Sequence, residues 1–395
     1  MAHPVFATFF VREACGWRLY FGAMKKPIRF GVVVEGIWLA VLIAGALYLL
    51  NSMMQKKSGI VAIAGGISLW PATAVDGAQK PAQSVPSPAL LVVNQGDKTM
   101  GIVDPAANKV VATVDEQQTE MHGHEIAVGP DGRTVYMPIY GNVGVGKPGL
   151  DGHEMIVIDL PTRTITGRVD FGHGVRPHCV VYEPVSGLLY VTTELDKGVA
   201  VIDPKTLKIV GSIPTTQEQS HMLAITRDGK RGYTANVGPG TVSVLDMVAR
   251  KTVKVIPIAG MTQRIALSVD DKWVFTSDQT KPRLAVIDTA TNTVAKWVEL
   301  PGLGYGAKAT ADGGWLLVAI QEKDVVAVVD LKTMKVARTI AVAKQPQEML
   351  IRPDGKVAYV AGLQAKQVSV IDLAQWKVVG AIDVGSYPDG LAWMK

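Results

Sequence analysis

Short apolar runs recur along residues 89–395 at a nearly constant spacing, with polar turn residues between them. The clearest run ends with the pattern Val/Ile-x-Asp, where x is any residue. Five copies of this pattern end at Asp203, Asp246, Asp288, Asp330 and Asp372. These closing aspartates are 43, 42, 42 and 42 residues apart, and two earlier copies end at Asp104 and Asp159. A period in the low forties with several short strands per copy is typical of a β-propeller. Seven copies therefore predict seven blades.

Each copy reads as four short strands rich in Val, Ile and aromatic residues. In the copy from Gln263 to Leu300, the predicted strands are 265–269, 273–276, 283–288 and 294–299. The turn Pro353-Asp354-Gly355 suits a type I turn, because Pro presets φ at the second position and Gly fits the fourth. The predicted fold class is all-β: a seven-bladed propeller of four-stranded blades.

The register also predicts how the ring closes. Residues 89–93 match second strands of other copies, so the first blade lacks its innermost strand. Residues 390–394, at the opposite end of the chain, match first strands and would supply it. One blade then combines the C-terminal innermost strand with three N-terminal strands, which removes the open edges of the ring.

The tyrosine motifs at the second strands carry a resemblance to a known family. They read Tyr190-Val191-Thr192-Thr193, Tyr233-Thr234-Ala235-Asn236 and Tyr359-Val360-Ala361, each followed by a Val-rich strand that closes on Asp. The chain here resembles the YVTN-repeat family of seven-bladed propellers, which includes surface-layer-type and YncE-like periplasmic proteins. The resemblance covers roughly residues 88–395 and implies the fold. It implies no single activity, since members serve several roles.

The N-terminal part differs from the repeats. Residues 53–74 combine a basic start, an apolar middle and the exit Ala72-Thr73-Ala74, which is typical of a secretory signal peptide. We predict that residues 1–52 are a mis-called upstream extension and that residues 75–88 are a linker to a propeller at 89–395. The alternative is a genuine membrane anchor at 31–50, which is 20 residues long. Both alternatives place the propeller outside the cytoplasm, in the periplasm or secreted.

Charge and cysteine content limit the partners. The formal net charge of +5 comes from the N-terminal segment, so the rest of the chain has no basic stripe and we expect no nucleic-acid partner. The two cysteines, Cys15 and Cys179, exclude an internal disulfide framework. We expect Cys179 to pack between blades and the protein to be a monomer.

Apart from His3, all histidines fall in or beside loops predicted to emerge on one face, around the central channel. His122 and His173 are expected to be solvated loop residues there, and His153 belongs to an insertion at 141–153 that would act as a lid or binding element. His124, His178 and His221 hold equivalent positions in three neighbouring copies. Carrying the register onward at 42-residue steps gives Gln263, Tyr305, Gln347 and Asp389. These seven side chains are predicted to ring the mouth of the channel.

Three convergent neutral imidazoles suit a divalent transition metal with one position open for water or substrate. His124, His178 and His221 are therefore candidate metal ligands, and Glu125, Glu154 and Glu194 are nearby carboxylates. Arg176 and Arg264 would receive a carboxylate or phosphate. The candidate ligand-binding residues are Arg176, Glu194, Gln263, Tyr305, Gln347 and Asp389. The structural alternative is that the histidines line a water-filled funnel and bind nothing.

We thus expect an exported propeller that binds a small ligand or a metal at a histidine-lined mouth. The alternative is an enzyme, because lactonase and cycloisomerase propellers look similar in fold and use His, Glu and Arg around the mouth. The candidate catalytic residues are then His178, Glu194 and Arg264, with His221 in support. A further alternative is a scaffold for other periplasmic proteins. No Cys-x-x-Cys-His motif is present, which excludes covalent c-type haem, and seven blades rather than eight argue against the d1-haem type.

Overall fold

The computed structural model describes residues 9–13, 16–20 and 85–395. The chain divides into two units, 1–77 and 78–395. Within the first unit, β1 (Phe9–Glu13) pairs with β2 (Gly16–Tyr20) as an antiparallel hairpin. The predicted anchor at 31–50, the signal peptide at 53–74 and most of the linker at 75–88 lie outside the described residues. In the part of the chain that is described, no helix is long and apolar enough to cross a bilayer.

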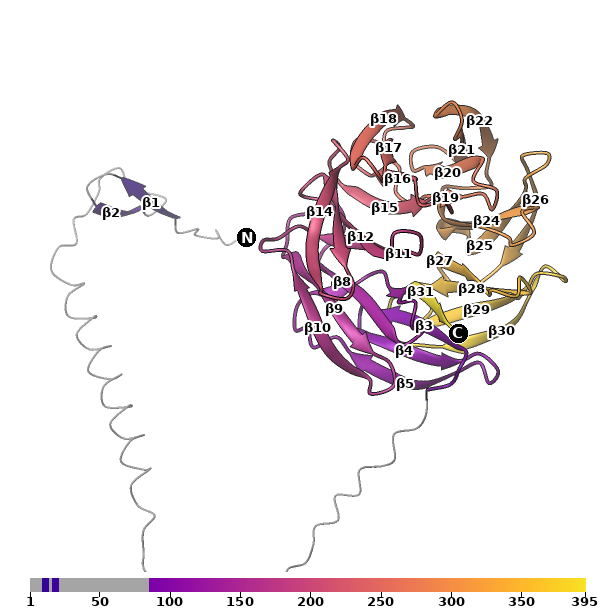
Figure 1. Ribbon diagram of the computed structural model, residues 1–395, viewed down its shortest axis with the longest axis horizontal. Helices are drawn as coiled ribbons and strands as arrows, with labels where there is room; N and C mark the ends of the chain where they lie inside the picture. Colours follow the sequence, from indigo (N-terminus) through magenta and orange to yellow (C-terminus); the bar gives the residue numbers. More distant parts are fainter. Residues whose placement is uncertain (1–8, 14–15, 21–84) are drawn as a thin grey trace, which may run out of the picture. The chain divides into compact units, whose positions relative to one another are not determined.

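The second unit is a ring of seven antiparallel four-stranded blades (Figure 1), and the predicted fold class is confirmed. Blade 1 contains β31 (Pro388–Met394), β3 (Ala89–Asn94), β4 (Thr99–Asp104) and β5 (Lys109–Asp115). Blade 2 contains β6 (His122–Gly123), β7 (Ala127–Val128), β8 (Thr134–Gly141), β9 (Asp151–Asp159) and β10 (Thr164–Asp170), because its first strand is split into β6 and β7. Blade 3 contains β11 (Pro177–Glu183), β12 (Leu188–Thr193), β13 (Gly198–Asp203) and β14 (Lys208–Pro214). Blade 4 contains β15 (Ser220–Ile225), β16 (Arg231–Asn236), β17 (Thr241–Asp246) and β18 (Lys251–Pro257).

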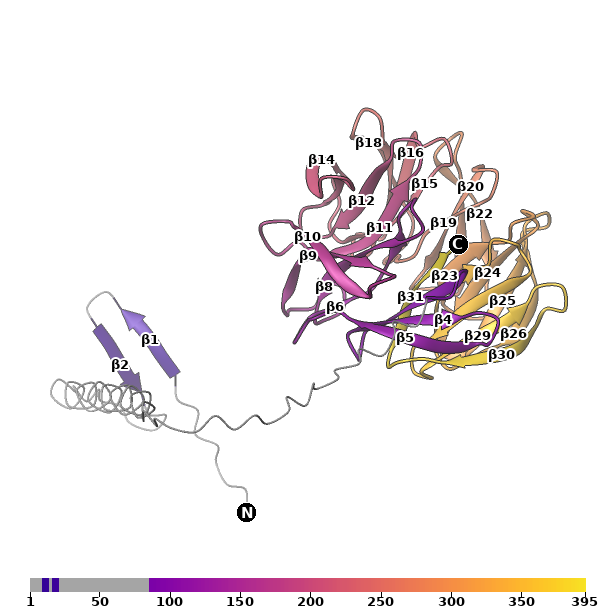
Figure 2. The ribbon, with the colours of Figure 1, turned by 60° about the horizontal axis from the view of Figure 1, so that its bottom comes forward.

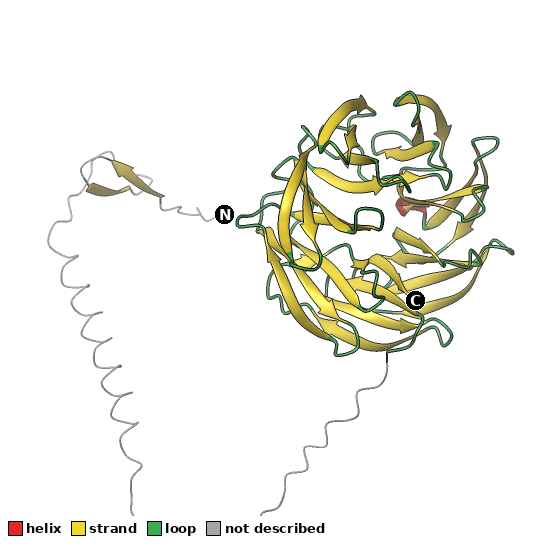
Figure 3. Cartoon of the chain, in the orientation of Figure 1, coloured by secondary structure: helices red, strands yellow, loops and turns green. Residues whose placement is uncertain are grey.

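The remaining blades repeat this plan. Blade 5 contains β19 (Ala266–Leu267), β20 (Trp273–Asp278), β21 (Arg283–Asp288) and β22 (Thr293–Glu299). Blade 6 contains β23 (Gly304–Ala309), β24 (Trp315–Ile320), the 3-10 turn η1 (Gln321–Lys323), β25 (Val325–Asp330) and β26 (Lys335–Ala341). Blade 7 contains β27 (Pro346–Ile351), β28 (Val357–Gly362), β29 (Gln367–Asp372) and β30 (Lys377–Asp383). Strands dominate the ring and loops connect them around the central channel (Figure 3). The first strand of blade 5 is shorter than predicted.

The core lies between neighbouring blades. Second and third strands such as β24 and β25 are buried along nearly their whole length, because adjacent blades cover both of their faces. Fourth strands such as β26 leave most residues partly or fully exposed and bury only Ile340. Cys179 packs in one of these clusters, as predicted, and burial raises the pKa of its thiol to about 12. Trp315 and Trp376 pack edge to face against a different cluster, with ring centroids 5.3 Å apart.

The repeated aspartates that close the third strands have a structural role. The Oδ1 atom of Asp372, for example, accepts hydrogen bonds at 2.8 Å from the backbone N–H groups of Ala374 and Gln375. Asp104, Asp246, Asp288 and Asp330 bind the turn that follows them in the same way. Each aspartate therefore fixes the hairpin between third and fourth strands, as expected for Asx turns.

The ring closes as predicted. Strand β31 pairs with β3 in an antiparallel register that joins Leu90 to Trp393 and Val92 to Leu391. In both views β31 lies at the inner end of the blade formed by β3, β4 and β5 (Figures 1 and 2). Without β31, strand β3 would be unpaired on the channel side of blade 1. Strand β31 therefore covers that edge.

We predict that deletion of residues 388–395 leaves β3 unpaired and yields a protein that aggregates or melts at least about 10 °C lower. Differential scanning calorimetry and size-exclusion chromatography measure this. Deletion of Lys395 alone, which lies outside β31, is the control and should melt normally. An unchanged melting temperature after the longer deletion would refute closure by β31.

Candidate functional site

The mouth residues lie at or just before the start of the first strand of each blade. A residue with positive φ precedes the mouth position by two residues in four blades: Arg176 (50°), Gln219 (53°), Gln345 (56°) and Tyr387 (53°). Non-glycine residues rarely adopt this left-handed conformation. Its repetition at one register shows that these four blades share the same backbone turn before the mouth position.

The turns bring the predicted mouth residues together. A cavity of about 260 Å³ lies at the axis; it is called the axial pocket below. Its lining includes six of the seven register positions: His124, His178, His221, Gln263, Tyr305 and Gln347. The seventh, Asp389, is fully buried and contacts His124 at 3.3 Å. Residues separated by more than two hundred positions in sequence therefore share one cavity.

The insertion between β8 and β9 covers one side of this pocket. Gly144 and Val145 line the cavity. Arg176 holds the insertion in place, because its Nη2 donates to the carbonyl of Lys147 at 2.7 Å and its Nε donates to Asp151 at 2.5 Å. Arg176 was expected to receive a ligand carboxylate. Its hydrogen bonds go instead to the chain that caps the mouth.

Four imidazole rings form a continuous stack from the rim to the axis. The ring centroids are 4.9 Å apart for His122 and His124, 5.0 Å for His124 and His178, and 3.5 Å for His178 and His221. His122 was expected to be solvated, but its ring is half-buried, and burial lowers its pKa to about 4. Among the described residues, no group of three or more His, Cys, Asp or Glu side chains is arranged to hold a metal ion.

His178 is the most unusual member of the stack. Only 1% of its surface is exposed, and neither Nδ1 nor Nε2 has a hydrogen-bond partner. Burial lowers its pKa well below the ordinary value, and the neighbouring His221, His124 and Arg264 add to this. The ring is therefore neutral and offers one donor and one acceptor to the pocket. A buried polar group without a partner costs about 1–3 kcal/mol.

His221 is held differently, by a carboxylate. Its Nδ1 is hydrogen bonded to Glu194, and the hydroxyl of Tyr140 donates to the same carboxylate at 2.8 Å. The Nε2 atom faces the pocket, 3.3 Å from the side-chain amide of Gln263. Burial lowers the pKa of His221 although Glu194 opposes that shift. A neutral imidazole oriented by a carboxylate, with its second nitrogen in a cavity, is the arrangement of a general base.

Arg264 forms the floor of the pocket. Its guanidinium crosses the channel to Glu125, to Glu348 at 2.9 Å and to Asp389 at 3.0 Å. Burial raises the pKa of Glu125 to about 8, although Arg264 opposes this shift. Burial also opposes ionisation of Asp389, but Arg264 and His124 outweigh it and bring that pKa to about 2. Arg264 was expected to bind a ligand carboxylate; three carboxyl groups of the chain already surround it.

The space for this cluster depends on glycine. Arg264, Glu125 and Glu348 each follow a mouth residue directly, and the same position in two other blades is Gly306 or Gly390. A side chain at Gly306 would collide with the carbonyl of Gln347, and one at Gly390 with the carbonyl of His124. These two glycines let the first strands approach closely enough for Arg264 to reach its partners.

The other predicted residues lie away from the axis. Glu154 accepts hydrogen bonds from Gln118 and Arg168, both at 2.6 Å, and takes no part in the pocket. His153 pairs with Asp170 and His173 with Asp196, on exposed parts of the rim. The expectation that Glu154 lies near the histidines is therefore wrong, whereas His173 is solvated as predicted.

Several pocket residues were missed from sequence, among them Gln95, Tyr140, Gln321 and Leu363. All four come from the ends of second strands rather than the starts of first strands. Carrying the repeat register from Glu194 would have found three of them, since Gln95, Gln321 and Leu363 hold the same position in other blades. The same repeat register predicts these positions, but it was followed only along the starts of the first strands.

A larger cavity of about 580 Å³ lies among the turns at the opposite ends of the strands, beside Trp273 and Trp315. The carboxylates there are engaged by their own turns: Asp270 accepts from the backbone of Lys272 at 3.2 Å and Asp312 from that of Gly314 at 3.1 Å. This cavity has no counterpart of the unpartnered His178. The axial pocket is therefore the stronger candidate site.

The fold and the site define a seven-bladed propeller with a histidine-lined, capped pocket on its axis. The family model for the cytochrome D1 heme domain matches residues 186–390, and the chain belongs to that family. The blade count was expected to argue against a relation to d1-haem propellers. The family match shows that this expectation is wrong for family membership. The YVTN-repeat resemblance stays a prediction. A comparison with curated protein sequences finds no match.

Solved structures share the fold at low sequence identity. The dihydro-heme d1 dehydrogenase NirN, in complex with DHE, is 15% identical with a TM-score of 0.58, over 77% of this chain and 74% of that one. The periplasmic gluconolactonase PpgL of Pseudomonas aeruginosa is 16% identical with a TM-score of 0.61, over 78% and 99%. A functionally unknown protein of Desulfotomaculum acetoxidans is 13% identical with a TM-score of 0.64, over 77% and 98%.

The family description implies a haem, but the described pocket does not fit one. Pockets for drug-sized ligands occupy about 300–1,000 Å³. The compartment in which His178 lies holds only about 260 Å³. The carboxylate groups of such a macrocycle would require free cations, whereas Arg264 and Arg176 are both paired with acids of the chain. The imidazole of His178 would be the residue to hold a haem iron here. The space and the charge around it suit a smaller molecule.

We predict that Arg264→Met lowers the free energy of unfolding by about 3–5 kcal/mol, because the buried carboxylate of Asp389 loses its counter-charge and the carboxyl groups of Glu125 and Glu348 lose a hydrogen-bond donor. Urea denaturation measures the change. Arg168→Met removes an arginine from a more exposed pair with Glu154 and should cost less than about 1 kcal/mol. Equal stability of the two variants would contradict the central role of Arg264.

Proposed function

We propose that this protein is an exported binding protein for a small uncharged polar molecule, held in the axial pocket. The observation that carries this proposal is His178, a buried imidazole with both ring nitrogens unpartnered. Buried polar groups in native proteins almost always have partners. A ligand with hydroxyl groups would supply a donor and an acceptor to this ring.

The lining supports an uncharged ligand. Among the described residues that line the pocket, Arg264 alone carries a formal charge, and three acids of the chain surround it. The other polar groups are the imidazoles of His124, His178 and His221, the amides of Gln95, Gln263, Gln321, Gln345 and Gln347, and the hydroxyls of Tyr140 and Tyr305. The cavity has the volume of roughly nine water molecules, which corresponds to a monosaccharide or a similar compact polyol.

Two features support the rest of the proposal. The insertion between β8 and β9, which Arg176 holds in place by hydrogen bonds, would shield a bound molecule from solvent. Export rests on the signal-peptide pattern at 53–74. A metal on His124, His178 and His221 remains the alternative occupant, and the stacked arrangement of these rings favours the polar molecule over it.

The test is isothermal titration calorimetry of the full chain without a His tag. Probes are the uncharged sugars glucose, galactose and mannose, with gluconate, hemin and Zn²⁺ for comparison. We expect an uncharged sugar to bind, and His178→Phe to weaken it at least about tenfold, or 1.4 kcal/mol. His173→Phe, on the exposed rim, should bind normally. Stoichiometric binding of hemin or Zn²⁺ with no binding of any sugar would overturn the proposal.

A second candidate function, opening of a lactone, is favoured by the Glu194–His221 pair. Nε2 of His221 would take a proton from water as its oxygen attacks the lactone carbonyl. The ring C–O bond would then break, and the proton would pass to the leaving oxygen.

If this candidate function is correct, the protein hydrolyses glucono-δ-lactone faster than the buffer alone does. A pH-stat measures the rate of acid release. His221→Asn should lower kcat by about 10²–10⁴-fold, the usual contribution of a general base. His173→Asn is the matched control. A rate equal to the buffer background excludes the lactonase function and does not affect the proposal that the axial pocket binds a small polar molecule.

A further inference from the structure

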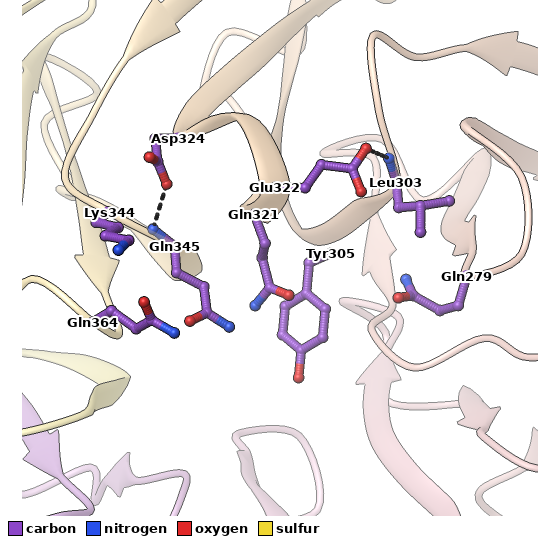
Figure 4. Close-up of a pocket in the computed structure, with 9 residues that line it drawn as sticks. All are labelled: Gln279, Leu303, Tyr305, Gln321, Glu322, Asp324, Lys344, Gln345 and Gln364. Carbon is purple, nitrogen blue, oxygen red and sulfur yellow. Dashed lines mark hydrogen bonds between the residues drawn. The ribbon is translucent and has the colours of Figure 1, made fainter.

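A second cavity opens beside the axial pocket on the same face of the ring (Figure 4). It has a volume of about 400 Å³ and is called the outer vestibule below; its lining includes Gln279, Tyr305, Gln321, Lys344, Gln345 and Gln364. Tyr305, Gln321 and Gln345 also line the axial pocket. The two cavities are therefore compartments of one elongated site.

Side-chain amides dominate the outer vestibule. Gln279 follows β20, Gln321 opens η1, Gln345 precedes β27 and Gln364 follows β28, so three blades contribute. Figure 4 shows the amides of Gln321, Gln345 and Gln364 directed into the same space. Each amide offers one acceptor oxygen and two N–H donors. This set matches neighbouring hydroxyl groups, each of which both donates and accepts.

Gln345 gives independent support for a ligand here. Its Oε1 atom is buried and has no hydrogen-bond partner. The residue has a φ of 56°, and Asp324 fixes that conformation by accepting from its backbone N–H at 2.8 Å. A constrained backbone thus holds an unused acceptor at the boundary between the two compartments.

The charges of the vestibule exclude most other ligand classes. Glu322 and Asp324 accept from the backbone N–H groups of Leu303, at 3.2 Å, and Gln345. Lys344 is the single cation against these two carboxylates, so the lining does not favour an anion. Leu303 is the only aliphatic side chain among the described lining residues, so a lipid or a flat macrocycle would find little apolar surface.

We propose that the site takes a short neutral oligosaccharide, with its terminal unit in the axial pocket and the next unit in the outer vestibule. This inference rests on the proposed function and specifies its ligand class. Tyr305 stands at the junction, with its ring fixed by Arg264 at 5.1 Å and its hydroxyl by Gln263 at 2.9 Å. Its position lets one residue contact both units.

Calorimetric titration of the full chain with maltose, cellobiose, lactose and trehalose, and with their monosaccharides, tests the inference. At least one disaccharide should bind tenfold or more tightly than its monosaccharide. Gln364→Ala, which changes an exposed residue of the vestibule alone, should weaken the disaccharide threefold or more and leave the monosaccharide unchanged. Gln367→Ala, which removes an exposed glutamine bonded to Asp383, is the matched control.

The outcomes separate the two proposals. If monosaccharides bind through His178 but no disaccharide binds more tightly, or Gln364→Ala leaves the ratio unchanged, the vestibule inference is wrong and the proposed function stands. If no sugar of either length binds, both are wrong. Disaccharide binding that responds to Gln364→Ala and to His178→Phe supports both.

Discussion

The inner ends of four blades depend on a single guanidinium. Arg264 lies in blade 5 and contacts Glu125 of blade 2, Glu348 of blade 7 and Asp389 of blade 1. All of these groups are buried or nearly so, and a buried charge without its partner is costly. The inner ends of the blades therefore cannot move apart independently, and the channel is closed beneath the mouth by a polar cluster rather than by apolar packing.

This arrangement determines the character of the pocket above it. Because Arg264 is paired with the acids of the floor, the other polar groups that face the cavity are imidazoles, amides and hydroxyls. Glu194 orients His221, whereas neither ring nitrogen of His178 has a side-chain hydrogen-bond partner. Buried polar atoms of His178, His124 and Gln345 are thus left unsatisfied around the site, and the binding of a ligand would recover part of their cost. The outer vestibule extends the same neutral, amide-rich chemistry.

Much of the fold followed from the repeat alone. A period of 42 residues with a fixed strand order determines the number of blades, the closure by β31 and the side chains that start each first strand, because all of these depend on local register. The ring of His124, His178, His221, Gln263, Tyr305 and Gln347 was accessible for the same reason. The second strands hold the same kind of information, as Gln321 shows.

The hydrogen-bond partners of the charged residues could not be predicted from the repeat. Arg264 pairs with Glu125, 139 residues away in sequence, and Arg176 donates to the insertion rather than facing a ligand. Both outcomes depend on distances across the ring, which no local pattern encodes. The same limit explains Glu154, which pairs with Arg168 on its own blade. It also explains His122, whose ring is covered by neighbours that a loop sequence does not reveal.

The position of β31 has a consequence for the order of assembly. Asp389 and Gly390, which complete the floor and pack against His124, lie in β31, which follows every other strand of the ring in the sequence. A chain folded only as far as β30 therefore contains most of the blades but no finished cavity. Recognition of any ligand in the axial pocket must wait until β31 has paired with β3.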